Sequence, residues 1–444
     1  MFLKKSKYTH ILEVDSKKVV FNSMTCAMAE ADDDFINLYE RIEDINEDDL
    51  TEEEAELVSD MMVGWYIVPD VVDEMNMIKL RNYAGKYSVE SLSLVIAPTV
   101  DCNFGCQYCF EHPKAGYLSR EVQDKLVDMV KENAERKREI DITWYGGEPL
   151  LAKDIIYDLS ERFIEICEQY EVHYSGMMIT NGYLLTDEDL GRLEQCRIGE
   201  VQITIDGTEE THNSRRFLKD NPSEGTFAKI IENVQKLYSR GIEVTIRINI
   251  DRTNLEETKN LILYLKGLGI PEAAVIFGHV SQSTEFNKGI EDTCLTMAEY
   301  ANASLELQGF LHAHGFSGSE FPHYPAVKKN YCGADSINTF VIDPKGYIYK
   351  CWNEVGDVKD SVGNILWDKS EYTAEMVSRN AAYMTWSPFE NEGCMACKML
   401  PICMGGCPYI GVVHGHKRCE RWKFGLEDTI KKMYKQRIEA DVEE

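Results

Sequence analysis

Residues 99–111 read Thr-Val-Asp-Cys-Asn-Phe-Gly-Cys-Gln-Tyr-Cys-Phe-Glu and place Cys102, Cys106 and Cys109 in a C-x3-C-x2-C spacing. The apolar run at residues 92–98 predicts a buried strand directly before this loop. Three thiolates on one short loop can ligate three irons of a four-iron, four-sulfur cluster, which leaves the fourth iron without a ligand from the loop. Zinc is the alternative, although zinc sites usually combine one close cysteine pair with a second pair elsewhere.

The chain that follows this loop alternates short apolar runs with helical segments up to about residue 280, a pattern typical of parallel βαβ units. The predicted strands are residues 92–98, 141–145, 174–180, 201–205, 243–250 and 273–277. Six such units indicate an α/β fold, an incomplete TIM-like (β/α)6 barrel. Because a parallel barrel places its chemistry at the carboxyl ends of its strands, the cysteine loop lies where a functional site is expected.

A second motif, Gly146-Gly147-Glu148-Pro149, ends the second predicted strand. Two glycines let the main chain approach a ligand closely, and a carboxylate accepts hydrogen bonds from an ammonium group. The alternative is a tight strand-to-helix turn with a capping acid. Polar residues also end the third and fourth strands, but Asn-Gly and Asp-Gly pairs are ordinary turn residues as well.

With the aromatic Tyr108 before its last cysteine, the loop resembles that of the radical S-adenosylmethionine (SAM) enzymes, and Gly-Gly-Glu-Pro resembles their second signature. The resemblance implies a 4Fe-4S cluster whose open iron binds S-adenosyl-L-methionine, and cleavage of that cofactor to a 5′-deoxyadenosyl radical. It also implies SAM contacts from Gly146, Gly147, Glu148, Pro149, Asn181, Thr204, Arg216 and Asn249. No catalytic acid or base is assigned, because no spacing marks His279 or Glu285 as a proton acceptor.

A second cysteine array lies towards the carboxyl end, at Cys332, Cys351, Cys394, Cys397, Cys403, Cys407 and Cys419. Residues 340–350 predict a hairpin with its turn at residues 343–346, which would bring the first two cysteines together. The array resembles the SPASM domain, which carries auxiliary 4Fe-4S clusters. A zinc ribbon is the alternative, because C-x2-C pairs also suit zinc.

The SPASM resemblance implies one cluster on Cys394, Cys397, Cys403 and Cys419, and another on Cys332, Cys351 and Cys407. The second set offers three ligands for four irons. In sulfatase maturases an additional cysteine before the first one completes the set, but residues 323–331 contain no cysteine. The sequence therefore predicts three 4Fe-4S clusters in total, one of the auxiliary clusters with an unassigned fourth ligand.

The amino-terminal region predicts a hairpin over residues 8–21, joined at Asp15 and Ser16, followed by helices at residues 33–42 and 51–62. This arrangement resembles the winged-helix RiPP recognition element, which captures a leader peptide as an extra strand at a sheet edge. A small domain that only packs on the barrel is the alternative. The predicted domains are residues 1–82 for leader binding, 88–315 for the barrel, 316–425 for SPASM and 426–444 for a carboxyl-terminal helix.

Composition limits the partners. The formal net charge of −29 over 444 residues argues against nucleic acid. No apolar run approaches the roughly 18 residues that would span a membrane, and the amino terminus lacks the apolar core of a signal peptide. Most of the 14 cysteines fall in metal-like spacings, which predicts a cytoplasmic protein, whereas Cys167 and Cys196 are predicted to be small buried side chains.

The combined resemblance implies a radical SAM-SPASM oxidoreductase that modifies a ribosomally made precursor peptide with a leader, and that receives electrons from flavodoxin or ferredoxin. The missing eighth cysteine suggests that a substrate thiolate occupies the open iron, so the predicted product is a thioether crosslink. An anaerobic sulfatase maturase that makes formylglycine is one alternative, and a multi-cluster electron carrier is another. The precursor, the residue attacked and the oligomeric state are not predicted.

Overall fold

The computed structural model describes residues 2–45, 50–111, 113–270, 274–316 and 324–443, with the side chains of residues 439–443 left out. It forms two compact units, each made of segments that are separate in the sequence. Tyr87–Phe321 and Cys332–Thr385 form the barrel unit, and Met1–Lys86, Pro322–Tyr331 and Trp386–Glu444 form the terminal unit. Each unit is described here by itself.

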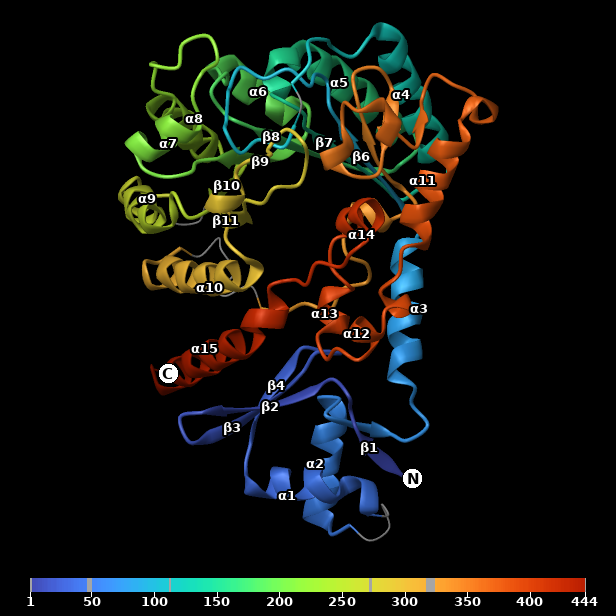
Figure 1. Ribbon diagram of the computed structural model, residues 1–444, viewed down its shortest axis with the longest axis vertical. Helices are drawn as coiled ribbons and strands as arrows, with labels where there is room; N and C mark the ends of the chain where they lie inside the picture. The colour runs from blue at the N-terminus through green and yellow to red at the C-terminus, as the bar shows by residue number, and fades with distance from the viewer. Residues whose placement is uncertain (1, 46–49, 112, 271–273, 317–323, 444) are drawn as a thin grey trace. The chain divides into compact units, whose positions relative to one another are not determined.

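The barrel unit is built on parallel strands in the order β11-β10-β9-β8-β7-β6 (Figure 1). Their bounds are β6 Ser91–Ile96, β7 Glu139–Trp144, β8 His173–Thr180, β9 Ile198–Thr204, β10 Glu243–Ile250 and β11 Ala274–His279. All six predicted strands are confirmed, although residue 273 of the last one lies outside the described residues. The parallel partial barrel is therefore the fold that the alternating pattern predicts.

Three further strands extend this sheet beyond β6, and the sequence did not predict their place. They are β12 Thr339–Ile342, β13 Tyr347–Tyr349 and β14 Gly363–Asn364. β12 pairs in parallel with β6, so that Ile342 lies opposite Ile96, and β13 returns antiparallel to β12. The predicted hairpin is confirmed, with Gly346 at a φ of +81° in its turn. The hairpin is thus part of the barrel sheet.

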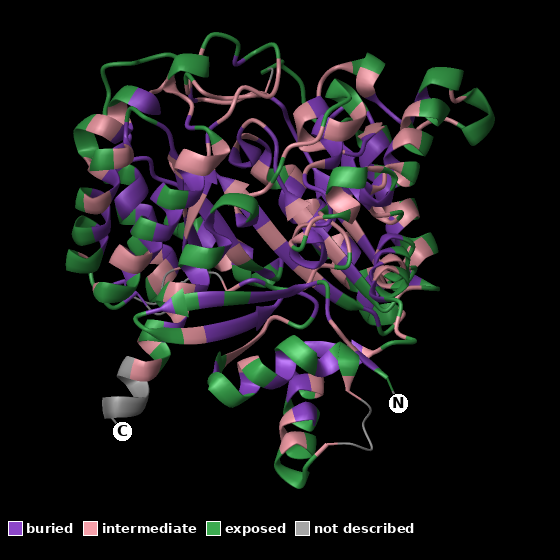
Figure 2. Ribbon diagram, turned by 60° about the horizontal axis from the view of Figure 1, so that its bottom comes forward, coloured by how far each residue is buried: buried purple, intermediate pink, exposed green. Residues whose placement is uncertain are grey.

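Helices cover the outer face of the sheet: α4 Arg120–Ala134, α5 Lys153–Gln169, α6 Asp187–Gln195, α7 Glu209–Arg215, α8 Phe227–Ser239, α9 Leu255–Gly267, α10 Met297–Ala313 and α11 Ala374–Thr385. Because side chains alternate along a strand, Leu94 and Ile96 of β6 enter the core shared with these helices, whereas Val95 enters a separate inner core with Val341 and Tyr349. Figure 2 shows the helices buried on one face and exposed on the other. Cys167 and Cys196 are buried in the outer core, as predicted.

The terminal unit begins with a three-stranded antiparallel sheet in the order β2-β3-β4. Its strands are β2 Thr9–Val14, β3 Lys17–Asn22 and β4 Ala27–Ala31, and a separate pair joins β1 Leu3–Lys5 to β5 Ile67–Pro69. The predicted hairpin is confirmed, and its turn residues Asp15 and Ser16 adopt φ angles of +47° and +69°. Two positive φ values are what a tight two-residue hairpin turn requires. Among the described residues, β4 pairs only with β3 and is an edge strand.

The helices of the terminal unit are α1 Asp33–Arg41, α2 Glu52–Val63, α3 Glu74–Lys86, α12 Glu392–Met395, α13 Leu400–Cys403, α14 Pro408–His414 and α15 Trp422–Glu443. The helices predicted at residues 33–42 and 51–62 are confirmed. Thr51 and Glu54 form a capping box that starts α2. One face of the strand sheet packs on α1 and α2, and the other packs on α15 through Trp422, Leu426 and Ile430.

The compact units do not follow the predicted domain boundaries. The predicted leader-binding segment ends at residue 82, whereas the terminal unit continues through α3 to Lys86. The predicted SPASM segment, residues 316–425, is divided between the units, and residues 317–323 of it lie outside the described residues. Packing causes the division, because β12 to β14 join the barrel sheet while Ile402 joins the core of β2, β3 and α15.

Candidate active site

The cysteine loop begins at the carboxyl end of β6 and lies against the end of β7. A Cβ atom on Gly146 would stand 2.2 Å from the Thr99 carbonyl oxygen, and one on Gly147 would stand 2.2 Å from the Asp101 carbonyl oxygen. Only glycine permits so close an approach of two backbones. The two glycines therefore make room for the backbone of the cysteine loop, and their predicted contact with SAM stays a prediction.

Glu148 lies at the same strand end and is fully buried. Its carboxylate accepts hydrogen bonds from Thr180 Oγ1 at 2.6 Å, from the Asn181 amide at 2.7 Å and from the Leu150 amide at 2.9 Å. Burial raises the pKa of Glu148, and these donors oppose the shift. The acid therefore ties the end of β7 to the end of β8, and its predicted contact with SAM stays a prediction.

Polar side chains from the ends of β9 and β10 and from the end of helix α7 meet at Tyr108 of the cysteine loop. The Tyr108 hydroxyl donates to Asp206 and accepts from Arg216 Nη1 at 2.6 Å and from Asn249 Nδ2 at 3.4 Å. The Asn249 amide donates to Asp206 Oδ1 at 2.9 Å. The structure thus brings together the predicted contacts Arg216 and Asn249 with Asp206, which lies two residues after Thr204, the last residue of β9.

Arg216 reaches the cysteine loop because the segment directly after Arg216 is hydrogen-bonded to the backbone of that loop. The Gly105 amide donates to the Phe217 carbonyl at 2.9 Å, and the Lys219 amide donates to the Asn103 carbonyl at 2.9 Å. Burial raises the pKa of the Cys106 thiol, and the Arg216 guanidinium opposes this shift. A buried cation beside the loop stabilises thiolates and the anionic cluster that thiolates hold.

Two buried donors at this site have no hydrogen-bond partner among the described residues, namely Asn103 Nδ2 and Arg216 Nε. Asn103 Oδ1 accepts from Asn181 Nδ2 at 2.8 Å, which links the cysteine loop to the end of β8. Unsatisfied donors beside three free thiols suit an anionic cluster and a ligand with a carboxylate. The residues present therefore fit a 4Fe-4S cluster and SAM, and the sequence motifs gave no signal for Asn103.

The remaining predicted contacts are placed as follows. Thr204 is the last residue of β9 and Pro149 begins the 3₁₀ turn Pro149–Ala152, and both are buried. His279 ends β11, where its Nε2 lies 2.7 Å from the Leu295 carbonyl oxygen. Glu285 is an exposed partner of Lys288. Neither residue is placed by the structure among the groups around Tyr108.

The sequence reasoning missed a half-buried carboxyl group, Glu111, which follows the last loop cysteine by two residues. Burial raises the pKa of Glu111 to about 7, and a hydrogen bond from Tyr145 opposes the shift. The Tyr145 ring packs on Trp352, with 4.5 Å between ring centroids. Trp352 directly follows Cys351, so the inner core carries the chain of the second cysteine array to the end of β7.

The carboxyl-terminal cysteines are divided between the units. Cys332 and Cys351 flank the β12–β13 hairpin in the barrel unit, where Lys350 Nζ donates to the Ser336 and Thr339 carbonyls at 2.5 and 2.7 Å. Cys394, Cys397, Cys403, Cys407 and Cys419 lie in the terminal unit. The joint ligand set of Cys332, Cys351 and Cys407 therefore stays a prediction. Among the described residues, no three side chains are grouped to hold a single metal ion, whereas a four-iron cluster takes one thiolate at each iron.

Within the terminal unit, four of these cysteines lie near one another, as pKa shifts caused by neighbouring groups and a backbone hydrogen bond indicate. Burial and the nearby thiols of Cys394 and Cys397 raise the pKa of Cys419. The Cys397 amide donates to the Cys394 carbonyl at 3.0 Å, so the C-x2-C pair forms one tight turn. Cys403 ends α13, and its pKa is raised by burial and then by the carboxylate of Glu420, the neighbour of Cys419. The set predicted for one auxiliary cluster is therefore gathered in one unit.

Comparison with known proteins agrees with this geometry. Residues 96–265 match the family model of the radical SAM superfamily. The mycofactocin maturase MftC of Mycolicibacterium smegmatis is 23% identical over 331 residues, which cover 70% of this chain and 76% of MftC. A serine-type anaerobic sulfatase-maturating enzyme of Bacteroides thetaiotaomicron is 27% identical over 167 residues, 35% of this chain and 38% of that enzyme.

Several solved structures cover most of the chain. SuiB of Streptococcus suis bound to the precursor peptide SuiA aligns with a TM-score of 0.53 at 14% identity, over 91% of this chain and 95% of SuiB. This likeness concerns the fold. Among the described residues, no helix combines the length and the apolarity that crossing a membrane requires.

An α/β partial barrel with three free cysteines after its first strand, and with buried polar groups converging beside them, defines a radical SAM site. Residues 96–265 are a radical SAM domain, and the protein is an enzyme of the radical SAM superfamily. It uses SAM and a 4Fe-4S cluster, for which Cys102, Cys106 and Cys109 are the predicted ligands. This assignment removes the zinc loop and the electron carrier as alternatives.

Proposed function

We propose that this enzyme installs a thioether crosslink in a ribosomally synthesised precursor peptide. The observation that carries the proposal is the hairpin β12–β13, whose strand β12 pairs with β6. Cys332 precedes this hairpin and Cys351 follows it, and Trp352 packs on Tyr145 just after the end of β7. Two of the proposed auxiliary ligands therefore flank a hairpin of the sheet whose strand β6 leads into the radical SAM loop. A relative named as a maturase and the likeness to SuiB, solved with its precursor peptide, support a peptide substrate.

The chemistry follows from the ligand count. When bound, SAM and its cluster supply a 5′-deoxyadenosyl radical that removes one hydrogen atom from a substrate carbon. Cys332, Cys351 and Cys407 offer three thiolates to an auxiliary cluster, and residues 323–331 offer no fourth. A soft substrate thiolate suits the remaining position. Formation of the C–S bond would release the thiol proton to water and one electron. The auxiliary cluster that these cysteines would hold could take up that electron and pass it to an oxidised flavodoxin or ferredoxin, and the reduced carrier would supply the one electron that cleavage of SAM consumes.

This proposal predicts a definite change in the peptide. After turnover with a cysteine-containing precursor from a neighbouring open reading frame, mass spectrometry should show a loss of two hydrogens and a thiol that no longer reacts with an alkylating agent. The matched control is the same peptide with its cysteine replaced by serine, which should remain unchanged. A product that has lost two hydrogens but keeps free thiols would rule out thioether formation.

The sulfatase maturase is the second candidate, because a sulfatase-maturating relative matches 167 residues of the chain. That reaction converts a cysteine or serine to formylglycine without joining two residues. The serine-containing control peptide separates the two candidates, because a formylglycine product carries an aldehyde that hydrazide reagents label. The missing cysteine in residues 323–331 disfavours this candidate.

The terminal unit is proposed to bind the leader of the precursor at strand β4. Ala27–Ala31 pairs with β3 on one side, and its other side offers main-chain groups to an incoming strand. The order of strands β2 to β4 followed by α1, α2 and α3 is that of a small winged-helix-like unit. The acidic net charge of −29 favours a basic segment in the peptide.

Leader binding at β4 should be visible in hydrogen exchange. Adding the precursor to the intact chain is expected to slow exchange of the outward-facing amides in residues 27–31, while amides of α1 keep their rates. Met28→Pro and Ala29→Pro form a matched pair of variants. Adjacent N–H groups of an edge strand alternate between the partner strand and the open side, so one variant removes an outward N–H group and the other an inward one. One variant should lose peptide binding and keep its stability. Unchanged exchange at β4 with saturating peptide would contradict the proposal.

A further inference from the structure

The cysteine turn of the terminal unit is fastened to its amino-terminal strands. Lys7 Nζ donates to the Met395 carbonyl at 2.5 Å, and Lys398 Nζ donates to the Thr9 carbonyl at 2.8 Å. The Ser23 hydroxyl also donates to the Lys398 carbonyl. Residues 394–398 are therefore held by contacts from the start of β2 and from the residue after β3, at the open end of this hairpin.

Tyr8 lies between these contacts and is fully buried. Its ring packs in one core with Phe389, Leu400 and Met404, and Cys394 packs against the same core. The Tyr8 hydroxyl has no hydrogen-bond partner among the described residues. Leaving a buried hydroxyl without an acceptor is unfavourable, so this group is placed for an acceptor that the described residues do not provide.

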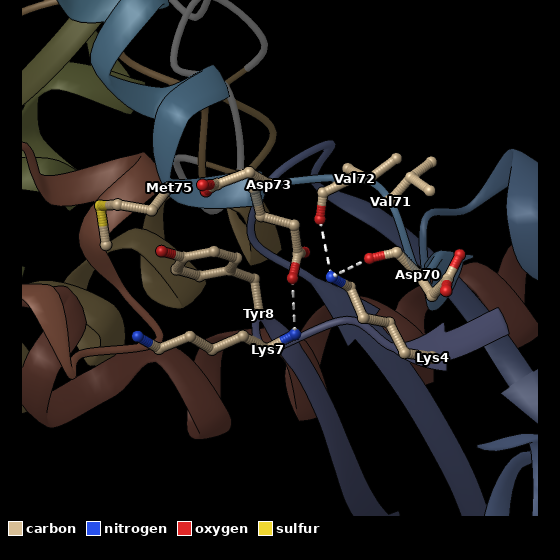
Figure 3. Close-up of a pocket in the computed structure, with 9 residues that line it drawn as sticks. Lys4, Lys7, Tyr8, Asp70, Val71, Val72, Asp73 and Met75 are labelled. Atoms are coloured by element: carbon tan, nitrogen blue, oxygen red, sulfur yellow. Dashed lines mark hydrogen bonds between the residues drawn. The ribbon is translucent and has the colours of Figure 1, made fainter. Parts of the chain in front are cut away.

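The surroundings of Tyr8 show where that acceptor would lie. A cleft of about 420 Å³ is lined by Lys4, Lys7 and Tyr8 and by residues 70–75. In Figure 3 the Tyr8 hydroxyl and the Lys7 amine point in the same direction, away from Lys4 and Asp70. Because Lys7 Nζ bonds Met395, this direction leads towards the cysteine turn.

Electrostatics agree with this placement. Burial, then the Glu74 carboxylate and then the Cys397 thiol raise the pKa of Tyr8, so the hydroxyl keeps its proton. Glu74 is already engaged, because it accepts from the Ser6 hydroxyl and from the Lys7 amide at 3.0 Å. The Asp73 carboxylate also raises the pKa of Tyr8, and it already accepts from the Asn76 amide at 2.9 Å and from Asn76 Nδ2 at 2.8 Å. Among the groups that act on the Tyr8 hydroxyl, the Cys397 sulfur therefore remains as an acceptor.

We propose that the Tyr8 hydroxyl donates a hydrogen bond to a sulfur of the auxiliary cluster held by Cys394, Cys397, Cys403 and Cys419, and so raises its reduction potential. The inference rests on the proposed auxiliary cluster. A hydrogen bond to sulfur stabilises the more negative reduced state, which is one of the ways proteins set cluster potentials. In this role Tyr8 changes the reduction potential of the cluster and takes no part in making or breaking covalent bonds.

Tyr8→Phe tests this role, because it keeps the ring and removes only the hydroxyl. The titration uses the full chain carrying Cys102→Ala, Cys106→Ala and Cys109→Ala, so that electron paramagnetic resonance reports the auxiliary clusters alone. One cluster should become harder to reduce by about tenfold in its equilibrium constant, which is 59 mV for a one-electron couple. Tyr66→Phe is the control, because Tyr66 is a buried tyrosine of the same unit in a different core; its potentials should stay unchanged.

Two outcomes would overturn the inference, and they differ in meaning. Unchanged potentials in Tyr8→Phe, with full iron content, would refute the hydrogen bond and leave the auxiliary cluster in place. An iron content that does not fall when Cys394 and Cys397 are replaced by alanine would show that no cluster is bound there, which would refute the proposed cluster and the role of Tyr8 together.

Discussion

Joint replacement of Cys102, Cys106 and Cys109 by alanine is expected to abolish cleavage of SAM. Each thiolate holds one iron of the cluster, and the loop contains no other sulfur ligand. Chromatography should detect no 5′-deoxyadenosine after reduction with dithionite. Iron analysis should show a loss of roughly four irons per chain while the auxiliary iron remains.

The matched control for this experiment is Cys167→Ala. Cys167 is fully buried in the outer core of the barrel and belongs to neither cysteine array. This variant should keep its iron and its rate of SAM cleavage, because it loses only a small apolar side chain. Retained cleavage in the triple variant would refute the assignment of the loop as the radical SAM cluster site.

Gly147→Ala is expected to have the second largest effect. The added Cβ would stand 2.2 Å from the Asp101 carbonyl oxygen and 2.6 Å from its carbonyl carbon. These are backbone atoms of the cysteine loop and cannot rotate away, so the loop or the end of β7 must shift. A displacement of about 1 Å in a catalytic site can cost roughly 10²-fold in rate, and we expect a loss of that size in 5′-deoxyadenosine formation together with reduced cluster iron.

Gly191→Ala serves as the comparison. Gly191 lies inside α6, where a Cβ would meet nothing within 4 Å. Alanine in a helix interior is favoured over glycine by about 0.5–1 kcal/mol, so this variant should unfold at a slightly higher temperature and turn over normally. Full iron and full activity in Gly147→Ala would show that the close approach of the two backbones is not needed.

The radical SAM domain could be predicted from the sequence because its signals are local. The C-x3-C-x2-C spacing lies within one loop, and each strand of the barrel is marked by its own apolar run. The same holds for the amino-terminal hairpin, whose turn at Asp15 and Ser16 joins adjacent strands. Features whose partners lie within one turn or one βα unit leave a pattern in the linear sequence.

The roles of individual site residues depended on contacts between distant segments. The sequence predicts the glycines of Gly-Gly-Glu-Pro as ligand contacts, and only the structure shows that the Asp101 carbonyl oxygen lies 2.2 Å from the Cβ position of Gly147. Tyr108 meets Asp206, Arg216 and Asn249 although 98 to 141 residues separate them in the chain. No spacing in the sequence carries such information.

The sequence by itself determined the chemistry of the cofactor, because cysteine identity and spacing within one loop decide which metal cluster can bind. The tertiary structure decided which elements share a sheet or a core. It added β12 to the barrel beside β6, and it placed Tyr8 in one core with residues around the Cys394 turn, 386 residues away. The physical reason is that hydrogen-bonded sheet edges and buried apolar faces choose their partners by shape and desolvation across the whole chain, whereas a ligand loop chooses its metal through neighbouring side chains.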